Sequence, residues 1–129
     1  MVRGGCLCGA VRFRVAADLA DPIACHCKEC RRQSGHYFAA VAAPGAALAF
    51  DAEHGLAWYG HTDIAARGFC RNCGTTLFWR GKDAPDVMIA MGALDDTGAL
   101  RLSAHYWVSE KGDYYRIADS LPQHDRGGG

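Results

Sequence analysis

The chain has 129 residues, half of them hydrophobic, and its 14 basic and 14 acidic residues give a formal net charge of zero. This composition predicts one globular domain over 1–125 and a short flexible tail at 126–129. It excludes a helical membrane span, since no run of roughly 18 apolar residues occurs. Balanced charge also disfavours nucleic-acid binding, which usually needs a basic surplus. The amino terminus lacks the apolar stretch of a signal peptide, so a cytoplasmic location is expected.

Short stretches in which apolar and polar residues alternate dominate the chain. At 11–15 the apolar side chains alternate with two arginines, which is typical of a half-buried strand. Residues 28–34, ending at Gly35, form the one segment expected to be a short helix. Further strands are predicted at 36–42, 47–50, 57–59, 76–79, 87–91 and 105–108. Together they predict an all-β fold of small antiparallel sheets joined by zinc-binding turns, with little helix.

The seven cysteines lie in three clusters, within which neighbouring thiols are separated by one or two residues, a spacing that suits metal ligands. A disulfide framework fits poorly, because the count is odd and thiols one residue apart do not pair easily. A closed structural zinc site takes four protein ligands, and a catalytic one takes three and keeps a position open. The sequence therefore predicts one zinc that stabilises the fold and one that does chemistry. The clusters are Cys6 and Cys8; Cys25, Cys27 and Cys30; and Cys70 and Cys73.

Glycines indicate how the cysteines group. Gly9 follows Cys8 and Gly74 follows Cys73, as in zinc-binding turns where the glycine adopts a positive φ. The favoured structural site is therefore Cys6, Cys8, Cys70 and Cys73, which would close a loop of about 60 residues and contribute folding free energy. A grouping in which the middle cluster shares its metal with Cys70 and Cys73 is the less favoured alternative.

The remaining three thiols, Cys25, Cys27 and Cys30, leave a fourth position for water, a histidine or a substrate thiolate. Thiolates bound to zinc are deprotonated at neutral pH and nucleophilic. The alternative is a second structural zinc, for which His36 is the best candidate as fourth protein ligand. His26 lies between two of the thiols on an extended stretch, so its side chain should point away from both sulfurs.

Basic residues lie next to the middle cluster. Arg31 and Arg32 follow Cys30 directly, and with Lys28 they place positive charge beside the predicted open site. An arginine there could bind a substrate carboxylate through two hydrogen bonds. The alternative is that these arginines are solvated on the exposed face of the predicted helix. His105 begins an apolar strand and is expected to be a hydrogen-bonded strand residue.

Taken together, these motifs resemble the glutathione-dependent formaldehyde-activating enzyme family, which also includes relatives of centromere protein V. The resemblance implies a zinc-binding fold of the Mss4-like type, with one zinc in each of the two cysteine groups described above. It also implies the family's named activity, the condensation of formaldehyde with glutathione to S-hydroxymethylglutathione, classed as a carbon–sulfur lyase acting in reverse. The resemblance is carried by the runs 5–13, 25–35, 69–77 and 105–108, followed by Lys111 and 119–122.

We therefore expect a zinc-dependent enzyme of the carbon–sulfur lyase type that adds a small thiol, glutathione, to formaldehyde or another small aldehyde. The expected partners are these small molecules, and neither nucleic acid nor a membrane is expected as a partner. The sequence leaves open whether the chain forms a homodimer. The alternative is a binding module with two structural zincs, in which Trp58 and Tyr59 contact a protein. The expected catalytic residues are Cys25, Cys27 and Cys30, and the expected substrate-binding residues are Arg31, Arg32 and His36.

Overall fold

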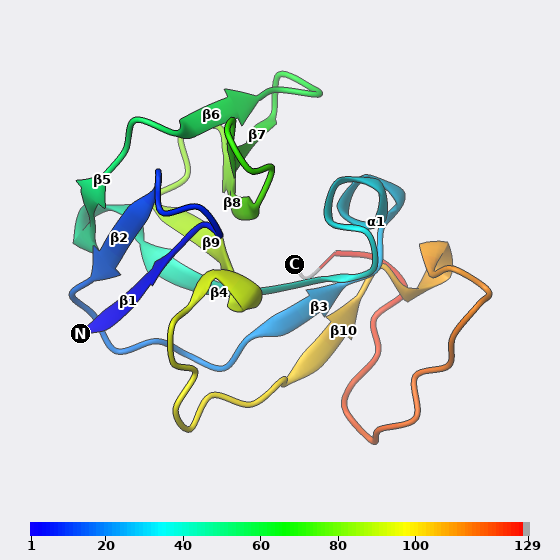
Figure 1. Cartoon of the computed structure of the whole chain (residues 1–129). Coiled ribbons are helices and arrows are strands. Elements are labelled where there is room, and N and C mark those ends of the chain that lie inside the picture. Colours follow the sequence, from blue (N-terminus) through cyan, green and yellow to red (C-terminus); the bar gives the residue numbers. More distant parts are fainter. Residues whose placement is uncertain (128–129) are drawn as a thin grey trace.

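The computed structural model describes residues 1–127, which form two β-sheets and one α-helix (Figure 1). The all-β prediction is confirmed. The smaller sheet is antiparallel, with the strand order β1 (Val2–Gly5), β2 (Arg12–Val15) and β5 (Leu48–Ala52). The larger sheet has the order β10 (Ala104–Tyr106), β3 (Ile23–Cys25), β4 (Phe38–Pro44), β9 (Asp86–Ala90), β8 (Thr76–Gly81), β7 (Ala65–Cys70) and β6 (Leu56–Tyr59).

The larger sheet differs from the small antiparallel sheets that the sequence predicts. It contains seven strands, and β10 pairs with β3 in parallel. Three strands, β1, β3 and β7, were not expected from the pattern. The strand β1 contains two glycines, which lower β propensity. The first of them, Gly4, packs so closely on the core that a Cβ atom there would lie 2.5 Å from the ring of Phe13.

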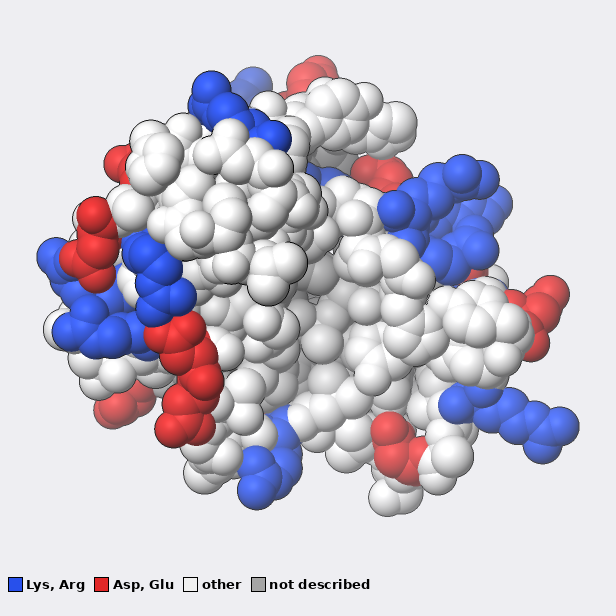
Figure 2. Space-filling view, in the orientation of Figure 1, with Lys and Arg blue, Asp and Glu red and all other residues white. Residues whose placement is uncertain are grey.

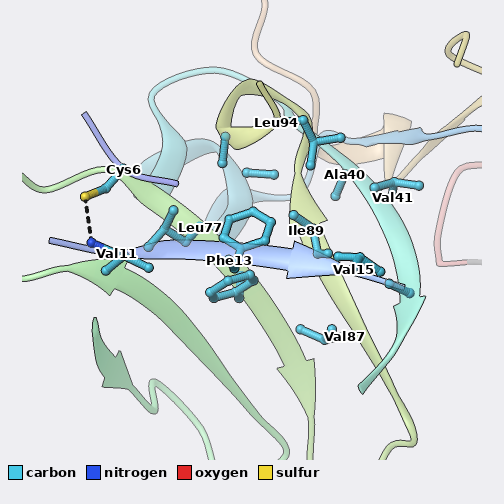
Figure 3. Packing of buried hydrophobic residues seen from close by; sticks show 14 of the residues in the cluster. Cys6, Val11, Phe13, Val15, Ala40, Val41, Leu77, Val87, Ile89 and Leu94 are labelled. Carbon is cyan, nitrogen blue, oxygen red and sulfur yellow. Dashed lines mark hydrogen bonds between the residues drawn. The ribbon is translucent and has the colours of Figure 1, made fainter. Parts of the chain in front are cut away.

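The core lies between the two sheets and contains two phenylalanines in edge-to-face contact. The ring centroids of Phe13 in β2 and Phe78 in β8 are 5.2 Å apart, and both side chains are fully buried. Figure 3 shows Phe13 among its aliphatic neighbours in the core. The core also reaches the first cysteine cluster, because the backbone N–H of Val11 donates a hydrogen bond to Sγ of Cys6 at 3.2 Å. The hydrophobic core is thus directly connected to the first thiol cluster.

The predicted helix is present as α1 (Lys28–Ser34). It begins after Cys27, whose sulfur accepts a hydrogen bond from the backbone N–H of Cys30 at 3.3 Å. It ends at Gly35, which has a φ of 94° and donates its N–H to the carbonyl of Arg31. The cap at Cys27 therefore holds the thiols of Cys27 and Cys30 together at the amino-terminal end of this short helix. Three 3₁₀ turns complete the described structure: η1 (Gly45–Ala47), η2 (Met91–Ala93) and η3 (Val108–Glu110).

The segment after η3 returns to β10 (Figure 1), where Gln123 pairs in parallel with His105. The N–H of His105 donates to the carbonyl of Pro122 at 2.9 Å, and the N–H of His124 donates to the carbonyl of His105 at 2.8 Å. Of the expected tail at 126–129, residues 128–129 lie outside the described part of the chain. Within 1–127, none of the helices has both the length and the apolar character needed to cross a membrane.

Candidate metal centres

The first and third cysteine clusters meet at one place. The sulfurs of Cys6, Cys8, Cys70 and Cys73 all lie within 4.8 Å of one another. The Sγ atoms of Cys6 and Cys8 are 3.7 Å apart, as are those of Cys8 and Cys70. All seven cysteines of the chain are free thiols. The fold therefore joins the turn before β2 to the turn between β7 and β8.

These distances fit a tetrahedral metal site. A disulfide would bring two sulfurs to about 2.0 Å, well below the distances found here. Four sulfurs placed about 2.3 Å from a central zinc form a tetrahedron with edges of about 3.8 Å. The observed separations of 3.7 Å match that edge. The donor chemistry and spacing of this four-thiol cluster thus suit zinc.

The turns that carry the four thiols need glycine. Gly9 and Gly74 have φ values of 87° and 78°, which confirms the positive φ predicted for both. We expect Gly74→Ala to lower the free energy of unfolding by about 1–2 kcal/mol, because the left-handed region is unfavourable for a side chain. An added Cβ would meet nothing within 4 Å, so the effect would come from the backbone alone.

Denaturant unfolding of the zinc-loaded protein measures this effect. Gly92→Ala is the matched control, because its Cβ would also meet nothing within 4 Å and its φ does not lie in the positive region. The control is expected to be neutral or slightly stabilising. Equal stability of the two variants would contradict the role assigned to the φ of Gly74.

The middle cluster forms a second group of thiols. The sulfurs of Cys25, Cys27 and Cys30 lie within 4.8 Å of one another, and no other His, Cys, Asp or Glu among residues 1–127 joins them. Hydrogen bonds from Cys25 and Cys30 hold the pKa of Cys27 at about 2. The hydrogen bond between Cys25 and Cys27 raises the pKa of Cys25. The three sulfurs of this three-thiol cluster therefore interact too strongly to ionise independently of one another.

Buried polar side chains gather around the three-thiol cluster. Within residues 1–127, three polar or charged side chains are buried: His26, Arg67 and His105. Arg67 in β7 is 6% exposed and approaches Sγ of Cys30 with its Nη1 at 3.6 Å. Its Nη2 lies 3.7 Å from Oε1 of Glu29 in α1. A buried cation beside a cluster of ionisable thiols favours their anionic form.

Sequence reasoning missed Arg67. The available signal was an arginine inside a run of small and apolar residues, Ala65–Cys70. Such a position is unusual for a charged side chain unless it is paired. The strand itself was not predicted, so nothing placed this arginine opposite the middle cysteines.

His26 points away from the thiols on either side of it, as expected. Its Nδ1 shares a hydrogen bond with the hydroxyl of Tyr115, and its Nε2 lies 2.9 Å from Nδ1 of His105. The side chain is buried, with 1% of its surface exposed. Burial and the neighbouring His105 lower its pKa to about 4, which keeps the ring neutral at physiological pH.

His105 is a hydrogen-bonded residue of β10, as expected, and it links His26 to the carboxyl end of the chain. Its Nε2 lies 3.0 Å from Oδ2 of Asp119. The hydrogen bond from His105 lowers the pKa of the Asp119 carboxyl. The sequence assigned no site role to Asp119 or Tyr115, because isolated polar residues beyond the last predicted strand carry no spacing pattern from which their partners could be inferred.

His36 lies in an aromatic group rather than in the three-thiol cluster. Its ring centroid lies 4.5 Å from those of Tyr37 and Tyr115, and its Nδ1 shares a hydrogen bond with the hydroxyl of Tyr114. It is therefore not brought to the sulfurs as a fourth ligand. Burial, followed by the nearby Tyr114, raises the pKa of Tyr115 to about 12.

Lysine and arginine side chains gather over α1, at the upper right of Figure 2. Arg31 and Arg32 lie in the last turn of this helix. Arg32 is exposed, whereas Arg31 is partly buried and its Nε has no hydrogen-bond partner within residues 1–127. A buried donor of this kind is usually satisfied by an acceptor from water or a ligand.

Comparison with known proteins adds to this geometry. A family model described as glutathione-dependent formaldehyde-activating enzyme matches residues 1–110. A Schizosaccharomyces pombe protein named "Uncharacterized lyase" is 32% identical over 119 residues, covering 90% of this chain and 85% of the relative. A Halomonas elongata protein named "Putative glutathione-dependent formaldehyde-activating enzyme" is 28% identical over 127 residues, covering 91% and 81%.

Solved structures also include a similar protein. A crystal structure of a Rhodobacter sphaeroides protein has a TM-score of 0.61 and 26% sequence identity to this chain. The match covers 75% of this chain and 91% of the other. The part of the sequence that the family model matches contains all seven cysteines and Arg67, and it ends before Tyr115 and Asp119.

Proposed function

Because the chain belongs to the glutathione-dependent formaldehyde-activating enzyme family, we propose that it joins a small thiol, glutathione, to formaldehyde or another small aldehyde. In this reaction a bond forms between the thiol sulfur and the carbonyl carbon. The π bond of the carbonyl breaks, and the proton that the thiol loses ends on the oxygen. The product is an S-hydroxymethyl thioether, and the reverse reaction is that of a carbon–sulfur lyase.

The observation that carries this proposal is the contrast between the two thiol clusters. One offers four sulfurs, which complete a tetrahedral site, and the other offers three with no further His, Cys, Asp or Glu within 1–127. In zinc proteins, closed four-ligand sites are structural, and sites with three protein ligands admit a water or a substrate. We therefore assign the structural role to the first cluster and the catalytic role to Cys25, Cys27 and Cys30.

The residues that would hold the catalytic zinc are these three cysteines. When bound, zinc supplies the positive charge that lowers the pKa of a nearby thiol and so favours its thiolate at neutral pH. The buried guanidinium of Arg67 offsets part of the negative charge that the three sulfurs carry when ionised.

Basic residues of α1 would bind the carboxylates of glutathione. The unpartnered Nε of Arg31 supports this role, because a carboxylate oxygen would satisfy it. Arg32 is exposed on the same turn. His36, which packs against Tyr37 and Tyr115, is the further residue that we propose for substrate binding. Holding thiol and aldehyde together can supply effective molarities on the order of 10⁵ M, which suffices for an addition that is already facile in water.

Calorimetric titration of reduced glutathione into the zinc-loaded protein tests the proposal. We expect binding to the wild type and loss of binding in Cys25→Ser, with zinc retained in the four-thiol cluster. S-methylglutathione is the matched control ligand, because it keeps both carboxylates and lacks the free thiol. It should bind more weakly by at least about tenfold. A wild type that carries two zincs and binds no glutathione would contradict the proposed reaction.

The rival function is a binding module in which both metals are structural. Its supporting observation is the exposure of Trp58 and Tyr59 on β6, the edge strand of the larger sheet. This module needs a fourth protein ligand at the middle cluster. An absorption spectrum of the cobalt-substituted protein that changes when glutathione is added would rule it out.

A further inference from the structure

The backbone on both sides of Cys27 is bonded to one short segment, 106–110, which runs from the end of β10 through the 3₁₀ turn η3 (Figure 1). The N–H of His26, the residue before Cys27, donates to the carbonyl of Tyr106 at 2.9 Å. The N–H of Lys28, the residue after it, donates to Oε1 of Glu110 at 3.0 Å. Segment 106–110 thus holds Cys27 between two hydrogen bonds to its neighbours.

The polar groups of Cys27 itself are directed into α1. Its carbonyl accepts a hydrogen bond from the N–H of Arg31 at 2.9 Å, and its sulfur accepts one from the N–H of Cys30 at 3.3 Å. These bonds fix Cys27 within the first turn of the helix. The bonds of the two flanking residues then fix where this turn lies relative to β10, and with it the sulfurs of Cys27 and Cys30.

A left-handed residue brings the second acceptor to this place. Trp107 has a φ of 58° and a ψ of 38°, a backbone conformation that is unfavourable for a bulky aromatic residue. Directly after it η3 begins, and the chain leaves the direction of β10 so that Glu110 reaches the start of α1. The unfavourable φ is therefore used to aim a side chain at the three-thiol cluster.

Neighbouring backbone keeps this bend in place. The N–H groups of residues 107–109 donate to the carbonyls of residues 124–126, at distances of 3.1, 3.2 and 3.3 Å. The hydroxyl of Ser109 donates to the carbonyl of Asp125 at 2.6 Å. A strained backbone conformation persists where the surrounding structure determines it in several ways. Segment 106–110 is thus a rigid support rather than a loose loop.

The carboxylate of Glu110 is committed to the start of α1. The side chain is half-buried, and within residues 1–127 it takes part in no salt bridge. A carboxylate binds an N–H donor more strongly than a neutral oxygen does. The contact that the structure gives to this charged group is therefore the one beside Cys27.

We propose that Glu110 is a positioning residue for the three-thiol cluster. Together with the carbonyl of Tyr106, its carboxylate fixes the backbone around Cys27 and so directs the sulfurs toward a shared metal. A site with three protein ligands depends on such support, because fewer bonds to the protein fix the metal. Contacts that orient metal ligands from outside typically change metal affinity by about 10- to 100-fold. This inference rests on the proposed function, which makes the same cluster catalytic.

Competition with a chromophoric chelator measures the zinc affinity of each cluster in the full chain. Glu110→Leu removes the acceptor and should weaken zinc binding at the three-thiol cluster by about tenfold, with the four-thiol cluster unchanged. Glu110→Gln keeps an acceptor oxygen and should stay within about twofold of the wild type. Asp113→Leu, which removes an exposed carboxylate nearby in the chain, is the matched control and should match the wild type. Equal affinity of Glu110→Leu and the wild type, or an equal loss in Glu110→Gln, would overturn the proposal.

Cadmium-113 NMR separates a change at this cluster from a change of the whole fold. Cadmium replaces zinc at thiolate sites, and the number of sulfurs gives each cluster a resonance of its own. In Glu110→Leu the resonance of the three-thiol cluster should shift or broaden, whereas that of the four-thiol cluster should keep its wild-type position. Movement of both resonances would overturn the assigned role.

Hydrogen exchange at the Lys28 amide tests the contact itself, even if Glu110→Leu does not fold. We expect slow exchange in the zinc-loaded wild type and in Glu110→Gln, and exchange as fast as in an unfolded chain would overturn the proposal. None of these measurements contains glutathione. A wild type that binds two zincs and no glutathione would therefore refute the proposed reaction and leave the result on Glu110 standing.

Discussion

Cys70→Ser is expected to leave the protein largely unfolded, whereas Cys27→Ser is expected to leave it folded with one zinc. Cys70 is completely buried, and its sulfur lies 3.7 Å from that of Cys8, 62 positions earlier in the chain. Binding of zinc to a four-thiolate site contributes about 10–16 kcal/mol of folding free energy in small zinc domains. That contribution is comparable to the whole stability of a domain, roughly 5–15 kcal/mol.

Circular dichroism and zinc content measure this difference. The two variants remove one sulfur each, so Cys27→Ser is the control for the loss of a thiol as such. It should keep the wild-type spectrum and bind one zinc per chain. A folded Cys70→Ser protein with a cooperative unfolding transition close to that of the wild type would show that the four-thiol cluster does not determine stability.

Arg67→Met is expected to weaken zinc binding at the three-thiol cluster by about tenfold to a hundredfold. Three thiolates and one divalent cation leave a net negative charge in a largely buried place, and the guanidinium of Arg67 compensates for it at 3.6 Å from Cys30. Methionine retains much of the apolar volume and removes the charge. The pKa of Cys27, which Arg67 helps to lower, should rise.

Competition with a chromophoric chelator measures the two zinc affinities separately. Arg80→Met is the matched control, because Arg80 is an exposed arginine on the neighbouring strand β8. It should leave both affinities unchanged, and Arg67→Met should leave the four-thiol cluster unchanged. If Arg67→Met binds the second zinc as tightly as the wild type does, the arginine has a packing role alone.

The sequence predicts the thiol grouping well because metal ligands follow strict local spacing. Cys8 and Cys73 are each followed by a glycine with positive φ, and that signal was enough to pair turns far apart in the chain. The helix 28–34 was also predictable, since its boundaries depend on a cysteine cap and on Gly35, which are local features.

The polar residues around the three-thiol cluster were much harder to predict. Arg67 reaches Cys30 through the order of strands in the larger sheet. Tyr115 and Asp119 reach His26 and His105 through the return of the chain along β10. Strand order depends on tertiary packing, which alternation along the chain does not encode. His26 illustrates this limit of sequence-based prediction. The direction of its side chain could be predicted, but its hydrogen-bond partners, Tyr115 and His105, could not.

The two thiol clusters also differ in when they become available during protein synthesis. Cys25, Cys27 and Cys30 leave the ribosome almost together, and a short loop joins them at little entropic cost. Cys6 and Cys8 leave it earlier, but their partner Cys70 follows Cys8 by 62 positions. A nascent chain can therefore complete its three-thiol cluster before its four-thiol cluster exists. The site that we assign to chemistry is thus expected to acquire its metal before the fold around it has closed.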